Sequence, residues 1–183
     1  SDAERLGIID RSKLHSIAGR SRKEQLALAK QFGIQDPPNS AGGCLLTDPA
    51  FSKRVYDLFE HTDGVPTLND VELLKVGRHF RLSTHAKLVV GRNQRENEIM
   101  KFLYLDDDYS FEAIEFTGPL GILRIKKGSE LRNDLKLLAG GIVGRYSDAP
   151  RDQMIKLTVF HQQKEITMVC QVSDNSVARK LSI

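Results

Sequence analysis

Cysteine is scarce in this sequence, which contains only two among its 183 residues. Cys44 and Cys170 lie far apart in unlike contexts, so they indicate neither a disulfide framework nor a cysteine-based zinc site. The histidines show no metal-ligand spacing either. The sequence therefore predicts no metal site, and any cysteine chemistry would depend on a single thiol.

Long apolar runs are also missing. No stretch approaches the roughly 20 apolar residues of a membrane-spanning helix, and the first residues lack the charged-then-apolar pattern of a secretory signal. Hydrophobic residues make up 40% of the chain and charged residues 28%, which is typical of a globular protein. We therefore expect a folded, cytoplasmic protein without a membrane partner.

Aromatic residues amount to only 7% of the chain. Tyr104, Tyr109 and Tyr146 are candidates for stacking on bases, but they do not form a platform interleaved with basic residues. The sequence therefore gives no support for sequence-specific reading of a nucleic acid.

Positive charge is concentrated in two stretches. Residues 1–35 contain seven basic and four acidic residues, and residues 77–102 contain six basic and two acidic residues. An acidic patch follows directly, and consists of Asp106, Asp107, Asp108, Glu112 and Glu115. Segregated charge favours a polyanion-binding face, because each phosphate contact releases counterions. The alternative is an ordinary solvated surface.

Helical signals occupy the first 76 residues. We expect helices that begin near Asp10, Ser21, Asp48 and Thr67, and the first of them should span residues 10–18 with Leu14 facing inward. Ser21 with Glu24, and Thr67 with Asp70, have the spacing of a capping box, and Asp48 precedes a first-turn proline.

From His79 onward the apolar period changes to two, which predicts strands. The expected elements are a hairpin over 79–90, a helix from Asn93 to Leu103, a strand pair over 111–117 and 121–125, a helix from Ser129 through Ile142, a hairpin over 156–161 and 165–172, and a frayed tail over 174–183.

These patterns favour the α+β fold class, with an N-terminal helical region followed by a mixed sheet of β-hairpins packed with two helices. We place the boundary at residue 76. Residues 1–76 would form a helical linker region with a Gly-Gly-Cys loop, and residues 77–183 an α+β domain.

Cys44 is a candidate catalytic residue. Gly42 and Gly43 permit a sharp turn before it, and a helix start follows, so that the helix dipole and upstream basic residues would favour a thiolate. The alternative is that Cys44 and the two leucines after it form a buried apolar step. Cys170 is different, because it lies on the apolar face of a strand and is expected in the core.

The turn from Val90 to Asn93 is a candidate phosphate clamp. Arg92 offers a planar fork of donors, and Asn93 lies at a helix start where backbone N–H groups are available. The alternative is that Asn93 only caps its helix while Arg92 pairs with Glu96.

Two further groups of residues would extend this phosphate-binding surface. Arg78, His79 and Arg81 lie on the first strand. The alternative for these three residues is an ordinary solvated strand face. Arg20, Arg22 and Lys23 lie in the first turn of a helix, where positive charge opposes the helix dipole and therefore has no stabilising role.

Three runs of sequence cover most of residues 10–83, and they are Gly19-Arg20-Ser21-Arg22-Lys23, PPNSAGGCLLTDPAFSKR and LNDVELLKVGRHFRL. They resemble a bacterial family of tRNA thiouridylase-like proteins whose N-terminal half is a PP-loop ATP pyrophosphatase. The resemblance implies a parent protein that uses ATP and magnesium to activate a tRNA uridine, and a cysteine persulfide to replace oxygen with sulfur. Gly43-Cys44 matches the segment that carries the second active-site cysteine.

The chain departs from that family in two ways. It lacks the Ser-Gly-Gly-x-Asp-Ser type of PP-loop that cradles pyrophosphate, and it lacks the first cysteine of the thiouridylase pair. We therefore expect no cofactor and no ATP use in this chain itself, which would be a fragment without the ATP-using half.

Three later runs, KLVVGRNQRENE, GPLGILRI and LKLLAGGIVGRYSDA, resemble in that order the RNA-binding domain of NFACT proteins. This likeness covers roughly residues 77–173 and implies an RNA partner. Together the two resemblances favour a tRNA-binding region of a tRNA-modifying protein. Two alternatives stay open, which are a part of a sulfurtransferase active site, and a module that docks a sulfur-donor protein through the acidic patch.

Overall fold

The computed structural model describes residues 2–17, 22–35 and 44–183. The chain divides into two compact units, residues 1–43 and residues 44–183, and each is considered by itself.

The first unit contains short helices. They are α1 (Asp2–Arg5), the 3-10 helix η1 (Arg11–Lys13) and α2 (Lys23–Gln31). The prediction of a helix over 10–18 is wrong beyond η1, whose start is capped by Asp10. Leu14, which the prediction placed inward, is exposed. The predicted second helix is confirmed as α2, but Ser21 lies outside the described residues and the N-cap is Arg22.

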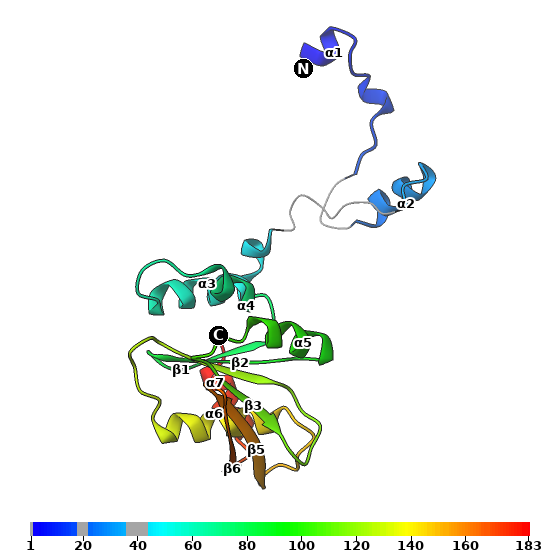
Figure 1. Ribbon diagram of the computed structural model, residues 1–183. Coiled ribbons are helices and arrows are strands. Elements are labelled where there is room, and N and C mark those ends of the chain that lie inside the picture. Colours follow the sequence, from blue (N-terminus) through cyan, green and yellow to red (C-terminus); the bar gives the residue numbers. More distant parts are fainter. Residues whose placement is uncertain (1, 18–21, 36–43) are drawn as a thin grey trace. The chain divides into compact units, whose positions relative to one another are not determined.

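The second unit begins with helices and continues with a sheet and further helices (Figure 1). Its helices are η2 (Leu45–Thr47), α3 (Pro49–His61), α4 (Leu68–Leu73), α5 (Gln94–Leu103), α6 (Asn133–Arg145) and α7 (Asn175–Leu181). Its strands are β1 (Arg78–Ser83), β2 (Ala86–Val90), β3 (Tyr109–Ala113), β4 (Gly121–Ile125), β5 (Met154–His161) and β6 (Lys164–Gln171).

Three helices begin where a local capping signal predicts. The Asp48 carboxylate accepts a hydrogen bond from Phe51 N at 2.7 Å. Thr67 and Asp70 form the expected capping box of α4, and Asn93 caps α5 by accepting from the backbone N–H of the third helical residue. Each of these bonds spans three residues, so the sequence alone contains both partners.

The strands form one antiparallel sheet in the order β1-β2-β4-β3-β5-β6. The α+β class is confirmed, although every pairing is antiparallel where a mixed sheet was expected. Both predicted hairpins are present. The predicted middle strand pair is β3 and β4, but β3 begins at Tyr109 and ends at Ala113.

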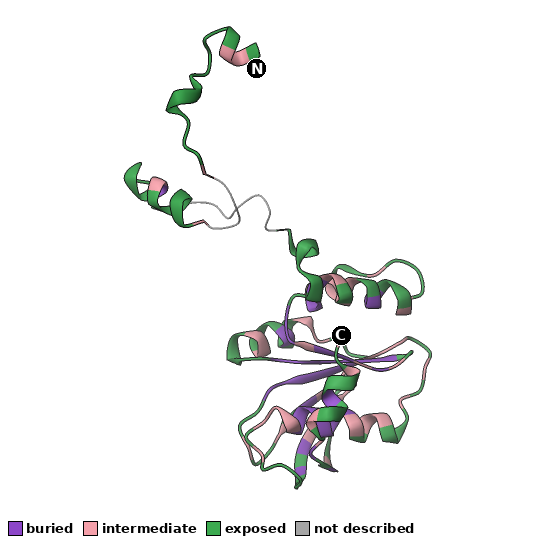
Figure 2. Cartoon of the chain, turned by 180° about the vertical axis from the view of Figure 1, so that it is seen from behind, coloured by how far each residue is buried: buried purple, intermediate pink, exposed green. Residues whose placement is uncertain are grey.

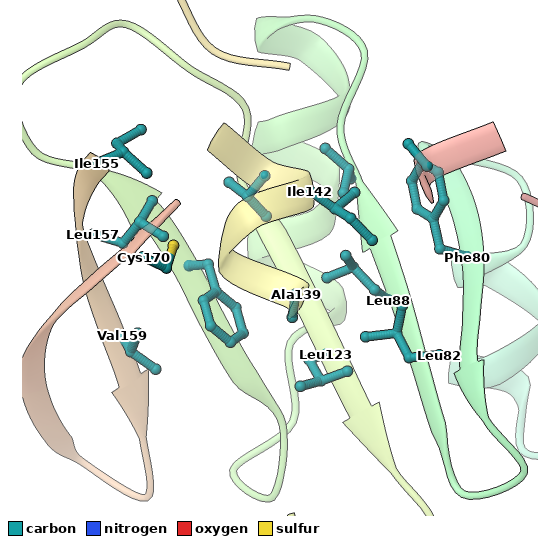
Figure 3. Packing of buried hydrophobic residues seen from close by; sticks show 14 of the residues in the cluster. Phe80, Leu82, Leu88, Leu123, Ala139, Ile142, Ile155, Leu157, Val159 and Cys170 are labelled. Atoms are coloured by element: carbon teal, nitrogen blue, oxygen red, sulfur yellow. The ribbon is translucent and has the colours of Figure 1, made fainter. Parts of the chain in front are cut away.

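Helices cover both faces of the sheet, and the buried residues gather between the layers (Figure 2). Alternate residues of β2 show this division, because Leu88 and Val90 belong to the cluster that contains α6 and α7, whereas Val89 packs with α4 and α5. In the larger cluster, Ala139 and Ile142 of α6 lie against the strand side chains (Figure 3).

The C-terminal tail is ordered, contrary to the prediction that it frays. Asp174 caps α7, and Ala178 is fully buried in the large core cluster. The chain end then pairs with the edge of β1, where Ser182 bridges Phe80 and Ile183 N donates to His79 O at 3.1 Å. The tail therefore covers part of an otherwise open sheet edge.

The predicted boundary at residue 76 stays a prediction. In the second unit Asp57 of α3 forms ion pairs with Arg81 and Lys87 of the sheet, and Leu73 of α4 belongs to the same core cluster as Met100 of α5 and Val89 of β2. Among the described residues, no helix is long and apolar enough to cross a membrane.

Close packing of α6 on β6 depends on glycine. A Cβ atom at Gly141 would lie 2.7 Å from Gln171 O and 2.5 Å from Ser173 Oγ. We expect Gly141→Ala to lower the free energy of unfolding by about 1–3 kcal/mol, because the clash is partly with backbone that cannot shift cheaply.

Gly144→Ala is the matched control in the same helix. Its Cβ would lie 3.0 Å from Ile155 Cγ2 and 3.3 Å from Val172 Cγ2, so these side chains need to shift by only a few tenths of an ångström. Urea unfolding of both variants measures the difference, and a Gly141→Ala protein as stable as Gly144→Ala would contradict this account.

Candidate functional site

Three basic side chains lie side by side on the sheet face beneath α3 and α4. The strand register pairs Arg81 with Lys87, and Lys87 with Arg124, across β1, β2 and β4. All three side chains are largely buried, at 19%, 10% and 17% exposure. Buried cations require compensation by opposite charge or hydrogen bonds.

Asp57 of α3 compensates two of these cations. Arg81 donates from Nε to Asp57 Oδ1 at 2.9 Å and from Nη2 to Oδ2 at 2.5 Å, while Lys87 Nζ lies 3.0 Å from Oδ2. Burial alone would raise the pKa of Asp57, but the hydrogen bonds and charges of Arg81 and Lys87 outweigh it, and the pKa is lowered. Burial lowers the pKa of Lys87 despite the nearby carboxylate.

Arg124 is compensated by two carboxylates instead. Its Nε and Nη2 donate to Asp108 at 2.9 and 2.8 Å, and Nη1 donates to Asp70 Oδ1 at 2.8 Å. Nη2 also donates to Leu103 O at 3.1 Å. Burial opposes the charged form, but Asp108 and Asp70 outweigh it and raise the pKa of Arg124.

His79 lies below the surface, at 2% exposure. Its Nε2 lies 2.8 Å from Val76 O, so that Nε2 carries the proton and Nδ1 presents a lone pair. Burial, together with the positive charges of Lys87 and Arg54, lowers the pKa of His79 well below its usual value. The structure therefore does not place His79 on an RNA-binding surface.

A cavity of about 750 Å³ adjoins this layer of charges. Its lining includes His79, Arg81 and Lys87 together with Leu58 and Leu74. It also includes exposed residues of the β1–β2 turn and of the segment before β3, among them Asp106 and Asp107.

The turn before α5 is held by its own residues. Asn93 caps the helix, and the Glu96 carboxylate accepts from Gly77 N at 3.1 Å and from Arg92 N at 2.9 Å. Arg92 Nη1 also pairs with Glu96 at 3.3 Å, and its side chain is 38% exposed. The contacts of the alternative interpretation, in which Asn93 caps the helix and Arg92 pairs with Glu96, are therefore present. The N–H groups of Gly77, Arg92 and Glu96 already have hydrogen-bond partners.

The other predicted RNA-binding residues are dispersed. Arg78 lies on the opposite sheet face, where its guanidinium stacks on Tyr146 with Cζ 4.6 Å from the ring centroid, and its Nη1 donates to Gly91 O at 3.0 Å. Arg81 is committed to Asp57. Arg20 lies outside the described residues, and Arg22 and Lys23 belong to the first unit, which is considered by itself.

The two cysteines have different environments. Cys170 is buried in the large core cluster, which confirms the prediction, and burial raises its pKa to about 11. Cys44 is exposed, and its carbonyl accepts from Thr47 N at 2.9 Å and Oγ1 at 2.7 Å at the start of η2. Gly42 and Gly43 lie outside the described residues.

Sequence reasoning missed Asp57, Arg54 and Lys87 as members of one cluster. The sequence did contain a signal for Lys87, because this charged residue lies within the otherwise apolar strand β2. Every residue of β2 is buried. The acidic patch is also not one surface, since Asp108 is buried against Arg124 and Glu115 pairs with Lys156. Within the described ranges no group of histidine, cysteine and carboxylate side chains could hold a metal ion.

Removing the Asp57 carboxylate should show how much free energy is lost when Arg81 and Lys87 are buried without a counter-charge. We expect Asp57→Asn to lower the free energy of unfolding by about 3 kcal/mol at neutral pH, because it leaves buried Arg81 and Lys87 uncompensated. A group with a lowered pKa stabilises the fold above its unfolded pKa and loses that contribution as pH falls through the folded value. The difference between wild type and variant should therefore shrink below about pH 4.

Urea unfolding across this pH range measures the effect. Asp134→Asn, which removes an exposed partner of Arg132, is the control and should change little. A difference for Asp57→Asn that does not depend on pH would contradict the assignment.

Comparison with known proteins identifies the family. The model of the NFACT protein RNA-binding domain matches residues 77–180, which is more than half of the chain. Among solved structures, the C-terminal part of the fibronectin/fibrinogen-binding protein from Streptococcus suis is similar at a TM-score of 0.53 and 11% identity. That match covers 76% of this chain but only 64% of the other, and it shows the fold alone.

No curated protein matches the chain. The thiouridylase resemblance of residues 10–83 accordingly stays a prediction. The likeness expected for residues 77–173 is confirmed and slightly extended, and the chain belongs to the NFACT RNA-binding domain family.

Proposed function

We propose that this chain binds structured RNA, with tRNA as its ligand, through arginine contacts to backbone phosphates. The observation that carries the proposal is the family match over residues 77–180. The choice of tRNA rests on the thiouridylase resemblance of residues 10–83.

The contact region that we propose is the turn surface, defined as Arg54, Arg92, Asn93 and Arg95. Arg54 lies close enough to Arg92 that burial and the charge of Arg92 together lower the pKa of Arg54. Arg92 and Arg95 are exposed, and Glu96 is the carboxylate that both faces Arg92 and influences Arg54. The surface therefore carries more positive than negative charge.

On this surface the helix start has a positioning role. Asn93 and Glu96 occupy the N–H groups of Glu96 and Arg92, and we assign the phosphate contacts to the guanidinium groups of Arg92 and Arg95. Asn93 holds the turn rigid while the arginines bind. In the first unit, Arg20, Arg22 and Lys23 would add phosphate contacts of the same kind, and Arg78 would support the turn through Gly91 O.

Charge reversal tests the turn surface. We expect Arg92→Glu and Arg95→Glu each to weaken binding of bulk tRNA by about tenfold, and to reduce the slope of log affinity against log salt by about one. Filter binding across a salt series measures both quantities, and circular dichroism checks the fold.

Lys156→Glu is the matched control, because it makes the same charge change on β5, which is separated from β1 and β2 in the sheet order. Equal losses in all three variants would show a non-specific charge effect. Unchanged affinity in both arginine variants would remove the turn surface from the proposal.

Sulfur transfer is a second candidate function, favoured by the exposure of Cys44. In this proposal an ATP pyrophosphatase half would use ATP and magnesium, a sulfur-donor protein would supply sulfur, and Cys44 would take part in tRNA thiolation. Joining the chain to such a half tests it. We expect Cys44→Ser to abolish thiolation while tRNA affinity stays unchanged, and thiolation at the wild-type rate would exclude the role.

A further inference from the structure

The two edges of the sheet differ in how the chain treats them. At the β1 edge, Ser182 bridges Phe80 and Ile183 N donates to His79 O. β6 forms the other edge, and within the part of the chain that the structure describes no segment pairs with its outer side. This strand is eight residues long, and it pairs with β5 without a bulge. An open edge of this kind is a template for pairing with another strand.

The hydrogen bonds between β5 and β6 determine which backbone groups of β6 point outward. Gln162 and Gln163 in the connecting turn have φ angles of 46° and 62°. Positive φ at both positions is typical of a type I′ turn, whose flanking residues form a hydrogen-bonded pair. Val172 N donates to Gln153 O, which gives the same phase at the far end of the hairpin. Because such pairs alternate along an antiparallel ladder, the even-numbered residues of β6 bond to β5.

The outward N–H and C=O groups therefore belong to Glu165, Thr167 and Val169, and all three residues are exposed. Between Ile166 and Cys170 the strand contains no charged residue and no proline, which are devices that protect edge strands from pairing. Ile166 and Val169 are each 47% exposed although both are apolar. The edge is therefore accessible and suited to a further strand.

We propose that β6 pairs in antiparallel fashion with β6 of a second copy of this chain, about a two-fold axis at Thr167. In this register Thr167 faces the partner's Thr167, and Glu165 faces the partner's Val169. The outward groups of both copies then meet and form about six hydrogen bonds. A shift by one residue would place these groups opposite residues that already bond to β5, and a shift by two would lose one of the pairs. The interface is closed, because each copy presents the same strand.

The side chains of this register fit one another. Ile166 lies opposite the partner's Met168 on the sheet face that packs against α6, where Met168 already contacts the large core cluster. Pairing would therefore bury the exposed Ile166 of each copy beside an apolar neighbour. On the other face, the two threonines at the axis form a favourable cross-strand pair, and no two like charges are opposed.

Charge is complementary at the end of the paired region. An open hollow of about 560 Å³ lies beside the C-terminal end of β6. It is lined by apolar side chains and by the carboxylates of Asp152 and Asp174, and none of the described residues that line it is basic. Arg145 and Arg151 act on Asp174 from outside this lining. The proposed register brings the partner's Lys164 to the same end of β6, where its ammonium group would face the two carboxylates.

Sedimentation equilibrium of the whole chain without nucleic acid tests the pairing. We expect the wild-type mass to rise with concentration toward twice the 20.5 kDa of one chain. Thr167→Lys should stay monomeric over the same range, because two like charges would be opposed at the axis. Val169→Lys is the matched control on the same strand, and it should still dimerise because the new lysine faces the partner's Glu165. Equal loss of the dimer in both variants would overturn the register.

A charge-swap experiment guards against a variant that fails to fold. Thr167→Glu should also be monomeric by itself, whereas a mixture of Thr167→Glu with Thr167→Lys should form a one-to-one dimer. A misfolded variant would not be rescued by mixing. If circular dichroism shows that both variants are folded and the mixture stays monomeric, the proposal is wrong.

Hydrogen exchange of the wild-type chain provides an independent readout. The amides of Glu165, Thr167 and Val169 should exchange more slowly as the concentration rises, while the amide of Met168, which bonds to β5, should not respond. A chain that stays monomeric at every concentration would overturn the proposal. Protection of the three amides in the monomer would show that another segment of the same chain covers this edge, and would overturn it as well.

Discussion

The fold of the second unit depends on how the buried guanidinium of Arg124 is compensated. Its donors reach Asp108 before β3, Asp70 in α4 and Leu103 O at the end of α5, so one side chain of β4 joins three segments. Two carboxylates face this single cation, whereas one carboxylate faces Arg81 and Lys87 on the adjacent strands. The positive excess is therefore confined to the β1–β2 side of the layer.

Local signals in the sequence predicted much of this fold. The caps at Asp48, Thr67 and Asn93 join atoms three residues apart, and the hairpins follow from the alternation of apolar residues. The predictions fail where tertiary contacts determine whether a helix forms. The tail forms α7 because Ala178 is buried against distant strands, while exposed Leu14 shows that the predicted helix over 10–18 has no comparable burial within the described residues.

The candidate site was less predictable, because its pairs are remote in sequence. Arg81 and Asp57 are 24 residues apart, and Arg124 and Asp70 are 54 residues apart. The basic stretch over 77–102 was visible as composition, but composition does not distinguish an arginine that a buried carboxylate holds from one that faces solvent. Arg81 and Arg92 were predicted to act alike, and the structure separates them.

Burial also determines what each cation contributes to binding. Arg92 and Arg95 are exposed, so their charges attract a polyanion across solvent and are screened by salt. Charges of this kind favour association with any polyanion. Lys87 is enclosed, and its ammonium group pairs with Asp57. Under the proposed function, the exposed arginines of the turn surface would supply affinity for the RNA backbone, whereas the buried cations contribute to the fold.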